Sequence, residues 1–147
     1  MAGARAEIVA CETCGNSQRD ASGRTRGEYL LEHLRAALAS GAAGAEPSLV
    51  DVTSVRCLWA CTRSCAVLVR SSSGPGYVIA GLEPTELSAR ALLDYAALYA
   101  ASADGAVPYK QWPAALKGHF LCRIPKSADV SLPNPEGSAS SPQEQLP

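Results

Sequence analysis

Residues 7–14 read EIVACETC, a short apolar-leaning run that leads directly into two cysteines spaced CxxC. The run predicts a strand over residues 7–10, which places Cys11 and Cys14 directly after the strand's end. A polar and charged segment over residues 15–27 follows and is typical of an exposed loop. The first strand is therefore expected to deliver two thiols to its carboxyl end.

A helix is expected after this loop. Thr25 and Glu28 have the spacing of a capping box, in which a hydroxyl and a carboxylate satisfy free amides of the first turn. Leucines recur at the helical period over residues 30–38, and Gly41 can end the helix in a left-handed conformation. The helix starts late in the chain relative to Cys11, so we expect its amino terminus to lie too far away to activate that thiol.

The remaining elements predict the fold class. Three further strands and a second helix, preceded by Thr85 as N-cap, are expected at residues 49–55, 66–69, 77–80 and 86–102. A strand–helix–strand unit favours parallel pairing, and two closely spaced strands favour an antiparallel hairpin. The sequence therefore predicts an α/β fold with a mixed sheet and helices packed on it (β-α-β-loop-β-β-α), the thioredoxin-like plan without one of its helices.

Length and composition limit the function classes. A chain of 147 residues suits one domain, predicted over residues 1–125, and the Ser/Pro-rich segment 126–147 has too little to bury and is expected to be a disordered tail. Lys and Arg number 13 against 14 Asp and Glu, which excludes nucleic-acid binding through bulk positive charge. No run reaches the roughly 18 apolar residues of a membrane span, and the start resembles no secretory signal. We expect a cytoplasmic protein with reduced thiols.

The six cysteines carry the functional signal. Cys57, Cys61 and Cys65 form CxxxCxxxC after the second predicted strand, as Cys11 and Cys14 follow the first. The carboxyl ends of two parallel strands lie at one edge of a sheet, so both groups are expected to meet there. The sixth, Cys122, stands in an apolar stretch and is expected to be a small buried side chain.

Clustered thiolates suit zinc or an iron–sulfur centre, since both prefer soft sulfur ligands. Zinc knuckles favour CxxC on both sides, whereas the second group here is CxxxC, which favours a 2Fe-2S cluster. The candidate ligands are Cys11, Cys14, Cys57 and Cys61, with Cys65 as an alternate.

Two other functions remain open: a zinc-binding or metal-handling accessory module, and thiol–disulfide exchange at the CxxC pair. Arg56 and Arg63 flank the second cysteine group and either stabilise its negative charge or lie free on the surface. Trp59 either shields the site from water or packs internally, and Trp112 is expected to anchor the C-terminal segment. The sequence contains no recognisable catalytic constellation.

Four segments together resemble a known family. They are the Cys11–Cys14 pair, residues 55–65, residues 98–108 and the run Cys122-Arg-Ile-Pro125. They are similar to a bacterial family of small predicted metal-binding proteins, largely a domain of unknown function, which is itself similar to the thioredoxin-like 2Fe-2S ferredoxins. The resemblance covers residues 8–125.

The resemblance implies a thioredoxin-like fold, a sulfur-ligated metal centre and one-electron transfer to a redox partner or reductase. Cys57 and Cys61 match the ferredoxins' CxxxC pair, and Cys11 matches their first cysteine. Cys14 replaces a second cysteine that the ferredoxins place about ten residues after the first, and Cys65 stands where they commonly have proline. Some family genes lie beside cobalamin-biosynthesis genes, which suggests electron supply to that pathway. A homodimer is compatible with these features, and no nucleic-acid or membrane partner is expected.

Overall fold

The computed structural model describes residues 5–15, 19–41, 48–72 and 74–126. The strands in these ranges are β1 (Ala6–Cys11), β2 (Val50–Val55), β3 (Val67–Arg70), β4 (Gly76–Ile79) and β5 (Phe120–Ile124). The α-helices are α1 (Arg26–Ser40) and α2 (Glu86–Ala101), and short 3-10 turns are η2 (Cys61–Arg63), η3 (Tyr109–Gln111) and η4 (Ala114–Leu116). The segment expected to be a disordered tail lies, apart from Lys126, outside the described residues.

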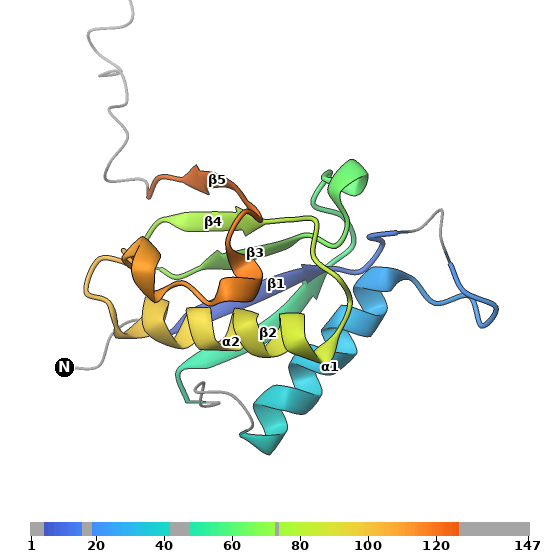
Figure 1. Cartoon of the computed structure of the whole chain (residues 1–147), viewed down its shortest axis with the longest axis horizontal. Helices are drawn as coiled ribbons and strands as arrows, with labels where there is room; N and C mark the ends of the chain where they lie inside the picture. The colour runs from blue at the N-terminus through green and yellow to red at the C-terminus, as the bar shows by residue number, and fades with distance from the viewer. Residues whose placement is uncertain (1–4, 16–18, 42–47, 73, 127–147) are drawn as a thin grey trace, which may run out of the picture.

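The strands form one mixed sheet in the order β2-β1-β3-β4-β5 (Figure 1). Strand β1 pairs in parallel with β2, while β3, β4 and β5 follow as antiparallel neighbours. A parallel β-α-β unit followed by an antiparallel hairpin and a helix is the thioredoxin-like plan, and the predicted fold class is confirmed. Between β2 and β3 the chain forms a loop over residues 56–66, hereafter the cysteine loop, instead of a long helix.

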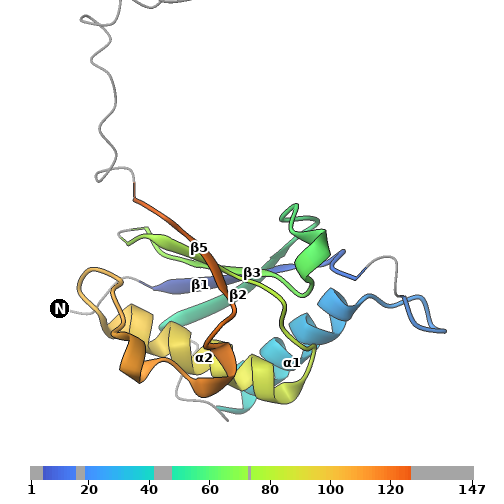
Figure 2. The same cartoon turned by 45° about the horizontal axis from the view of Figure 1, so that its top comes forward.

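Both α-helices pack on the same face of the sheet (Figure 2). The core between them is formed by alternate residues of the central strands, such as Ile8, Val67 and Val69, and by leucines and tyrosines of the helices. On the opposite face, residues that pair across four neighbouring strands make an apolar row. This row consists of Val9, Leu68, Val78 and Cys122.

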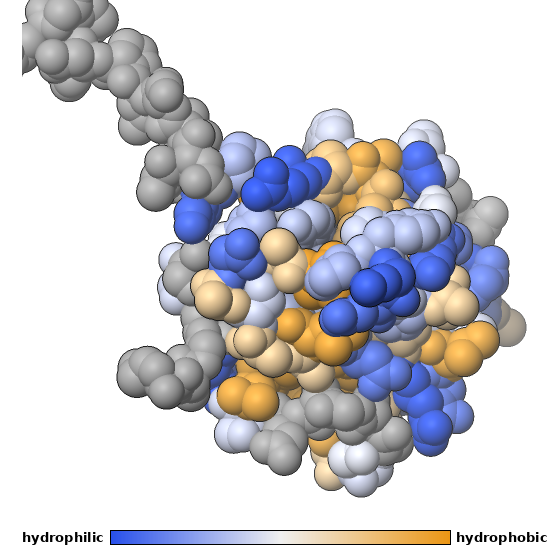
Figure 3. All heavy atoms as spheres, turned by 60° about the vertical axis from the view of Figure 1, so that its left-hand side comes forward, coloured by the Kyte–Doolittle hydropathy of each residue, from blue (hydrophilic) through white to orange (hydrophobic). Residues whose placement is uncertain are grey.

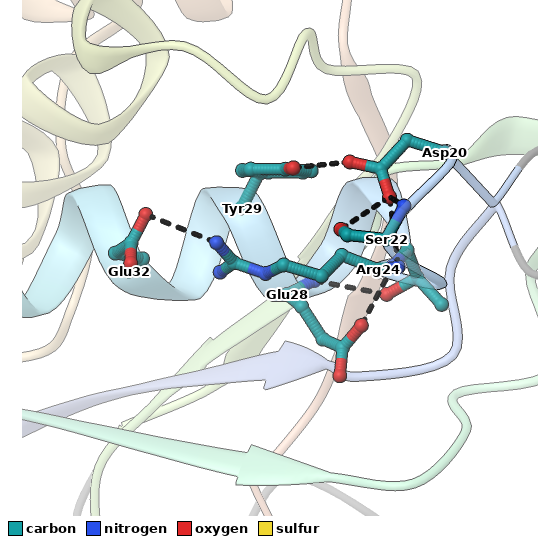
Figure 4. A network of polar contacts seen from close by, with 7 residues as sticks. Asp20, Ser22, Arg24, Glu28, Tyr29 and Glu32 are labelled. Atoms are coloured by element: carbon teal, nitrogen blue, oxygen red, sulfur yellow. Dashed lines mark hydrogen bonds and ion pairs between the residues drawn. The ribbon is translucent and has the colours of Figure 1, made fainter.

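Helix α1 begins as its sequence predicts. Thr25 and Glu28 form the capping box in both directions, and Gly41 ends the helix at φ 67° in the left-handed conformation. Before the helix, the carboxylate of Asp20 accepts hydrogen bonds from Ser22, from the amide of Arg24 and from the Tyr29 hydroxyl (Figure 4). These bonds tie the end of the preceding loop to the first turns of the helix.

Strand β5 has no counterpart in the elements expected from the sequence. It is an edge strand that pairs with β4 through a register irregularity between Val78 and Ile79. Because it lies at the edge, Cys122 is exposed, and the expectation that this thiol is buried is wrong. Trp112 does anchor this segment: its ring stacks on Phe120 with centroids 4.0 Å apart, and its indole nitrogen donates to the carbonyl of Val107.

The end of the molecule that lies on the left in Figure 1 shows hydrophilic side chains interleaved with small apolar patches (Figure 3). At this end, Arg70 pairs with Glu7 at 2.8 Å, and Arg5 pairs with Asp51. Across the described ranges, none of the helices has the length and apolar character that a bilayer crossing requires.

Candidate metal centre

The CxxC pair lies at the carboxyl end of β1 and is attached to the cysteine loop by the backbone. The amides of Glu12 and Thr13 donate to the carbonyls of Val55 and Arg56 at 2.9 and 3.1 Å. The Thr13 hydroxyl adds a bond of 2.5 Å to the same Arg56 carbonyl. The carboxyl ends of β1 and β2 therefore lie side by side, and the two cysteine groups meet at one edge of the sheet.

The amino terminus of α1 also reaches this edge. Gly27 donates its amide to the carbonyl of Cys14 at 3.0 Å, and the Thr25 hydroxyl donates to the carbonyl of Glu12 at 2.5 Å. A methyl group on Gly27 would lie only 2.0 Å from the carbonyl oxygen of Cys11. The expectation that the helix begins too far away is therefore wrong, because Thr25 and Gly27 at its start contact the backbone of Glu12 and Cys14.

Cys57 and Cys61 form an outer pair on the cysteine loop. Their sulfurs are 3.9 Å apart, Cys57 is partly exposed and Cys61 is exposed. Two thiolates on one tetrahedral metal with bonds of about 2.3 Å lie ~3.8 Å apart, so this separation suits a shared ion. The amide of Trp59 donates to the Cys57 sulfur at 3.2 Å and lowers the pKa of that thiol.

Cys14 and Cys65 form an inner pair with no exposed surface. The amide of Ala66 donates to the Cys14 sulfur at 3.3 Å, but burial dominates and raises the pKa of Cys14 to about 12. Burial likewise raises the pKa of Cys65 to about 11, against the opposing positive charge of Arg26. Arg26 forms an ion pair with Glu83 at 3.4 Å, and its buried Nε has no hydrogen-bond partner among the described residues.

Cys11 contributes to the pKa shifts of cysteines in both pairs. After burial, it is a further cause of the raised pKa of Cys14. After the Trp59 amide, it is among the groups that lower the pKa of Cys57, and it contributes to the raised pKa of Cys61, which is set mainly by Cys57. Cys11 itself is buried, and its sulfur lies 3.7 Å from the carbonyl oxygen of Arg56. The structure thus brings the CxxC segment and the cysteine loop together at one edge of the sheet.

The donor set fits a sulfur-ligated metal, although the side chains are not gathered around one point. Within the ranges that the structure describes, no group of three or more His, Cys, Asp or Glu side chains is arranged to hold a metal ion. The buried thiols would have to lose their protons on metal binding, which is how cysteine binds metals generally. Cys122, on β5, is separated from β1 by two strands. The Nδ1 atom of His119 forms a hydrogen bond of 3.0 Å with the carbonyl oxygen of Ala80.

The fold and this edge define a thioredoxin-like α/β protein with a cysteine-rich loop in place of one helix. A family model described as "Protein of unknown function (DUF1636)" matches residues 8–126, and the chain belongs to this family. A search of curated proteins found no match.

A solved structure of a thioredoxin-like [2Fe-2S] ferredoxin from Aquifex aeolicus is similar to this chain with a TM-score of 0.39 and 13% identity. The similarity covers 55% of this chain and 71% of that one. The resemblance stated from the sequence, to a family described as a domain of unknown function, is confirmed by the match to this family model.

Proposed function

We propose that this protein binds a 2Fe-2S cluster at the edge formed by β1, β2 and the cysteine loop, and that it serves as a one-electron carrier. The observation that carries the proposal is that backbone hydrogen bonds bring together, at one edge of the sheet, two cysteine groups that 42 residues separate in the sequence. A 2Fe-2S cluster supplies reversible uptake of one electron. No substrate pocket is needed for this role.

Cys11, Cys57 and Cys61 are three of the proposed ligands. The fourth comes from the inner pair: Cys14, as the sequence spacing favours, or Cys65 as the alternate. Cys11 contributes to the raised pKa of both inner thiols, but among the described residues a backbone amide donates only to the sulfur of Cys14. An amide that donates to a sulfur ligand stabilises the added negative charge of the thiolate, so Ala66 favours Cys14.

The same amide contacts give the protein a way to set the reduction potential. Trp59 donates to Cys57 in the outer pair, and Ala66 donates to Cys14 in the inner pair. Amide donors disperse negative charge on ligand sulfurs, and the more reduced state gains most from them. The helix amino terminus at Gly27 adds partial positive charge beside the inner pair.

Thiol–disulfide exchange has less support. An exchange reaction needs an accessible thiolate, as found when a nucleophilic cysteine has a lowered pKa and some exposure. Here Cys11 and Cys14 are 1% and 0% exposed, and burial raises the pKa of Cys14 to about 12. The helix terminus is close, yet it does not offset the effect of burial on the pKa of Cys14.

The test is anaerobic purification followed by a visible spectrum and analysis of iron, zinc and acid-labile sulfide. We expect a red-brown protein with about two irons and two sulfides per chain, the content of one such cluster. One zinc and no colour would replace the proposal by a zinc module, and a metal-free protein with disulfide reductase activity would replace it by exchange.

Single serine variants identify the ligands. We expect Cys11→Ser, Cys57→Ser and Cys61→Ser each to lose most of the metal, and Cys122→Ser to keep it, because that thiol lies two strands away from β1. Comparing Cys14→Ser with Cys65→Ser assigns the fourth ligand. Full metal retention in the Cys11 variant would overturn the proposed site, since Cys11 is a ligand whichever inner thiol is the fourth.

A further inference from the structure

One aromatic side chain on the cysteine loop lies almost entirely in solvent. Trp59, between Cys57 and Cys61, is 91% exposed, whereas the preceding Leu58 is partly buried against the core. Neither expectation from the sequence holds, because the indole neither packs internally nor covers the thiols. A free indole of this size next to the proposed metal centre requires its own explanation.

The backbone holds Trp59 in this position. Its φ is 63°, in the left-handed region that bulky side chains rarely occupy. Its amide donates to the sulfur of Cys57 at 3.2 Å, so one turn both contacts a proposed ligand and presents the indole to solvent. Unfavourable backbone conformations of this kind are typically kept at functional sites.

The segment of sequence that carries this indole has charges of one sign. Residues 52–82 contain no Asp or Glu, but they contain arginines at positions 56, 63 and 70. Arg70 is neutralised by Glu7 at the far end of β3. Arg56 and Arg63 are exposed on either side of Trp59, and in the part of the chain that the structure describes no ion pair joins either of them to a carboxylate.

We propose that Trp59, Arg56 and Arg63 form a docking surface for a protein partner that carries carboxylates around an apolar recess. Tryptophan and arginine are the side chains that most often dominate binding energy at interfaces. The indole would fill the recess, and the guanidinium groups would pair with the carboxylates. This inference rests on the proposed electron-carrier function and defines the class of redox partner: an acidic protein that docks directly over Cys57 and Cys61.

Two other occupants fit the charges less well. A second copy of this chain, docked loop to loop, would bring the same arginines together, and like charges at an interface are repulsive. Anionic lipid surfaces are usually recognised by clusters of about four to eight basic residues, more than this loop provides. An acidic protein surface needs only a few matched pairs around one anchor.

The test uses the two indole N–H signals of the full-length ¹⁵N-labelled protein, since the chain has two tryptophans. Trp112 donates its indole N–H to Val107 and serves as the internal control. The probes are a flavodoxin, an acidic electron carrier, and cytochrome c, a basic one. We expect flavodoxin to shift or broaden the signal of the exposed Trp59 indole, with reversal in about 0.3 M salt, while Trp112 stays unchanged.

Two variants test the contribution of the Trp59 indole separately from that of the two arginine charges. Trp59→Ala and the double variant Arg56→Glu/Arg63→Glu are each expected to weaken flavodoxin binding by about tenfold or more, as loss of an interface anchor does. The matched control, Arg35→Glu/Lys110→Glu, makes the same change in net charge at exposed positions outside the cysteine loop and should bind as the natural protein does.

Three results would overturn this inference: no change at Trp59 with flavodoxin, an equal change with cytochrome c, or a change that grows with the protein's own concentration, which would indicate self-association. The measurement needs no electron transfer. A chain that holds no 2Fe-2S cluster yet binds flavodoxin through Trp59 would refute only the proposed function, and a chain that holds the cluster without this binding would refute only the docking surface.

Discussion

Replacing Gly27 with alanine should destabilise the fold, although the same change in an exposed helix usually stabilises it by about 1 kcal/mol. The new methyl carbon would lie 2.0 Å from the carbonyl oxygen of Cys11 and 3.2 Å from the side chain of Cys14. Real contacts of this kind need at least 3.0 Å, so the helix or the strand must move by about 1 Å. Strand β1 is paired on both sides, which leaves the helix to move.

The expected magnitude combines three contributions. Overpacking costs about 1–3 kcal/mol, and weakening the bond from the Gly27 amide to the Cys14 carbonyl costs about 1 kcal/mol more. The higher helix propensity of alanine offsets about 1 kcal/mol of this loss. We therefore expect a net loss of about 2 kcal/mol in the free energy of unfolding. With a urea dependence of about 2 kcal/mol per molar, the unfolding midpoint falls by ~1 M.

Urea unfolding followed by far-ultraviolet circular dichroism measures this loss. The control is Ala36→Gly on the exposed side of α1, which should cost only about 1 kcal/mol through propensity. We also expect Gly27→Ala to lower the metal content, because the helix terminus would press on both CxxC residues. A midpoint equal to or above that of the natural protein would refute the close contact between α1 and β1.

Three further outcomes follow from the described contacts. Thr25→Ala should cost about 1–2 kcal/mol in urea unfolding, because the hydroxyl caps α1 and also contacts Glu12, and an unchanged midpoint would contradict that role. Hydrogen bonds from Ser22, Tyr29 and Arg24 hold the pKa of Asp20 below its usual range. The stabilisation that they give the fold is therefore present above about pH 4 and is lost as the pH falls further. As the pH is lowered, the urea midpoint of Asp20→Asn should decline less steeply than that of the natural protein. Burial raises the pKa of Tyr95, so stability should fall as the pH rises above about 10, and the tyrosinate absorbance of Tyr95, taken as the difference from Tyr95→Phe, should appear together with unfolding rather than before it.

The elements that the sequence predicts well are those with strong local signals. The capping box at Thr25 and Glu28 and the glycine at position 41 set the two ends of α1, and Thr85 caps α2 as expected. Parallel pairing of β1 with β2 follows from the strand–helix–strand order, and it brings the cysteine groups to one edge. These features depend on neighbouring residues and on general rules of chain connection.

The features that sequence reasoning missed depend on distant contacts. Strand β5 forms because the ring of Trp112 holds Phe120 beside α2 and β4, and no periodic pattern marks this short edge segment. The return of the chain to Cys14 before α1 depends on single hydrogen bonds from Thr25 and Gly27. The glycine at position 27, directly after the capping threonine and one arginine, is the sequence signal that could have indicated a close approach.

The placement of Cys11 within β1 has a consequence for the speed of the proposed chemistry. This residue lies opposite Val55 in the last register position shared with β2, and its amide donates to the carbonyl of Ala66 at 3.3 Å on the other flank. A sulfur on a segment that is hydrogen-bonded on both sides changes position little when the charge beside it changes. Small nuclear rearrangement lowers the barrier to electron hopping, so a carrier built on this strand would exchange electrons quickly even with a weakly bound partner.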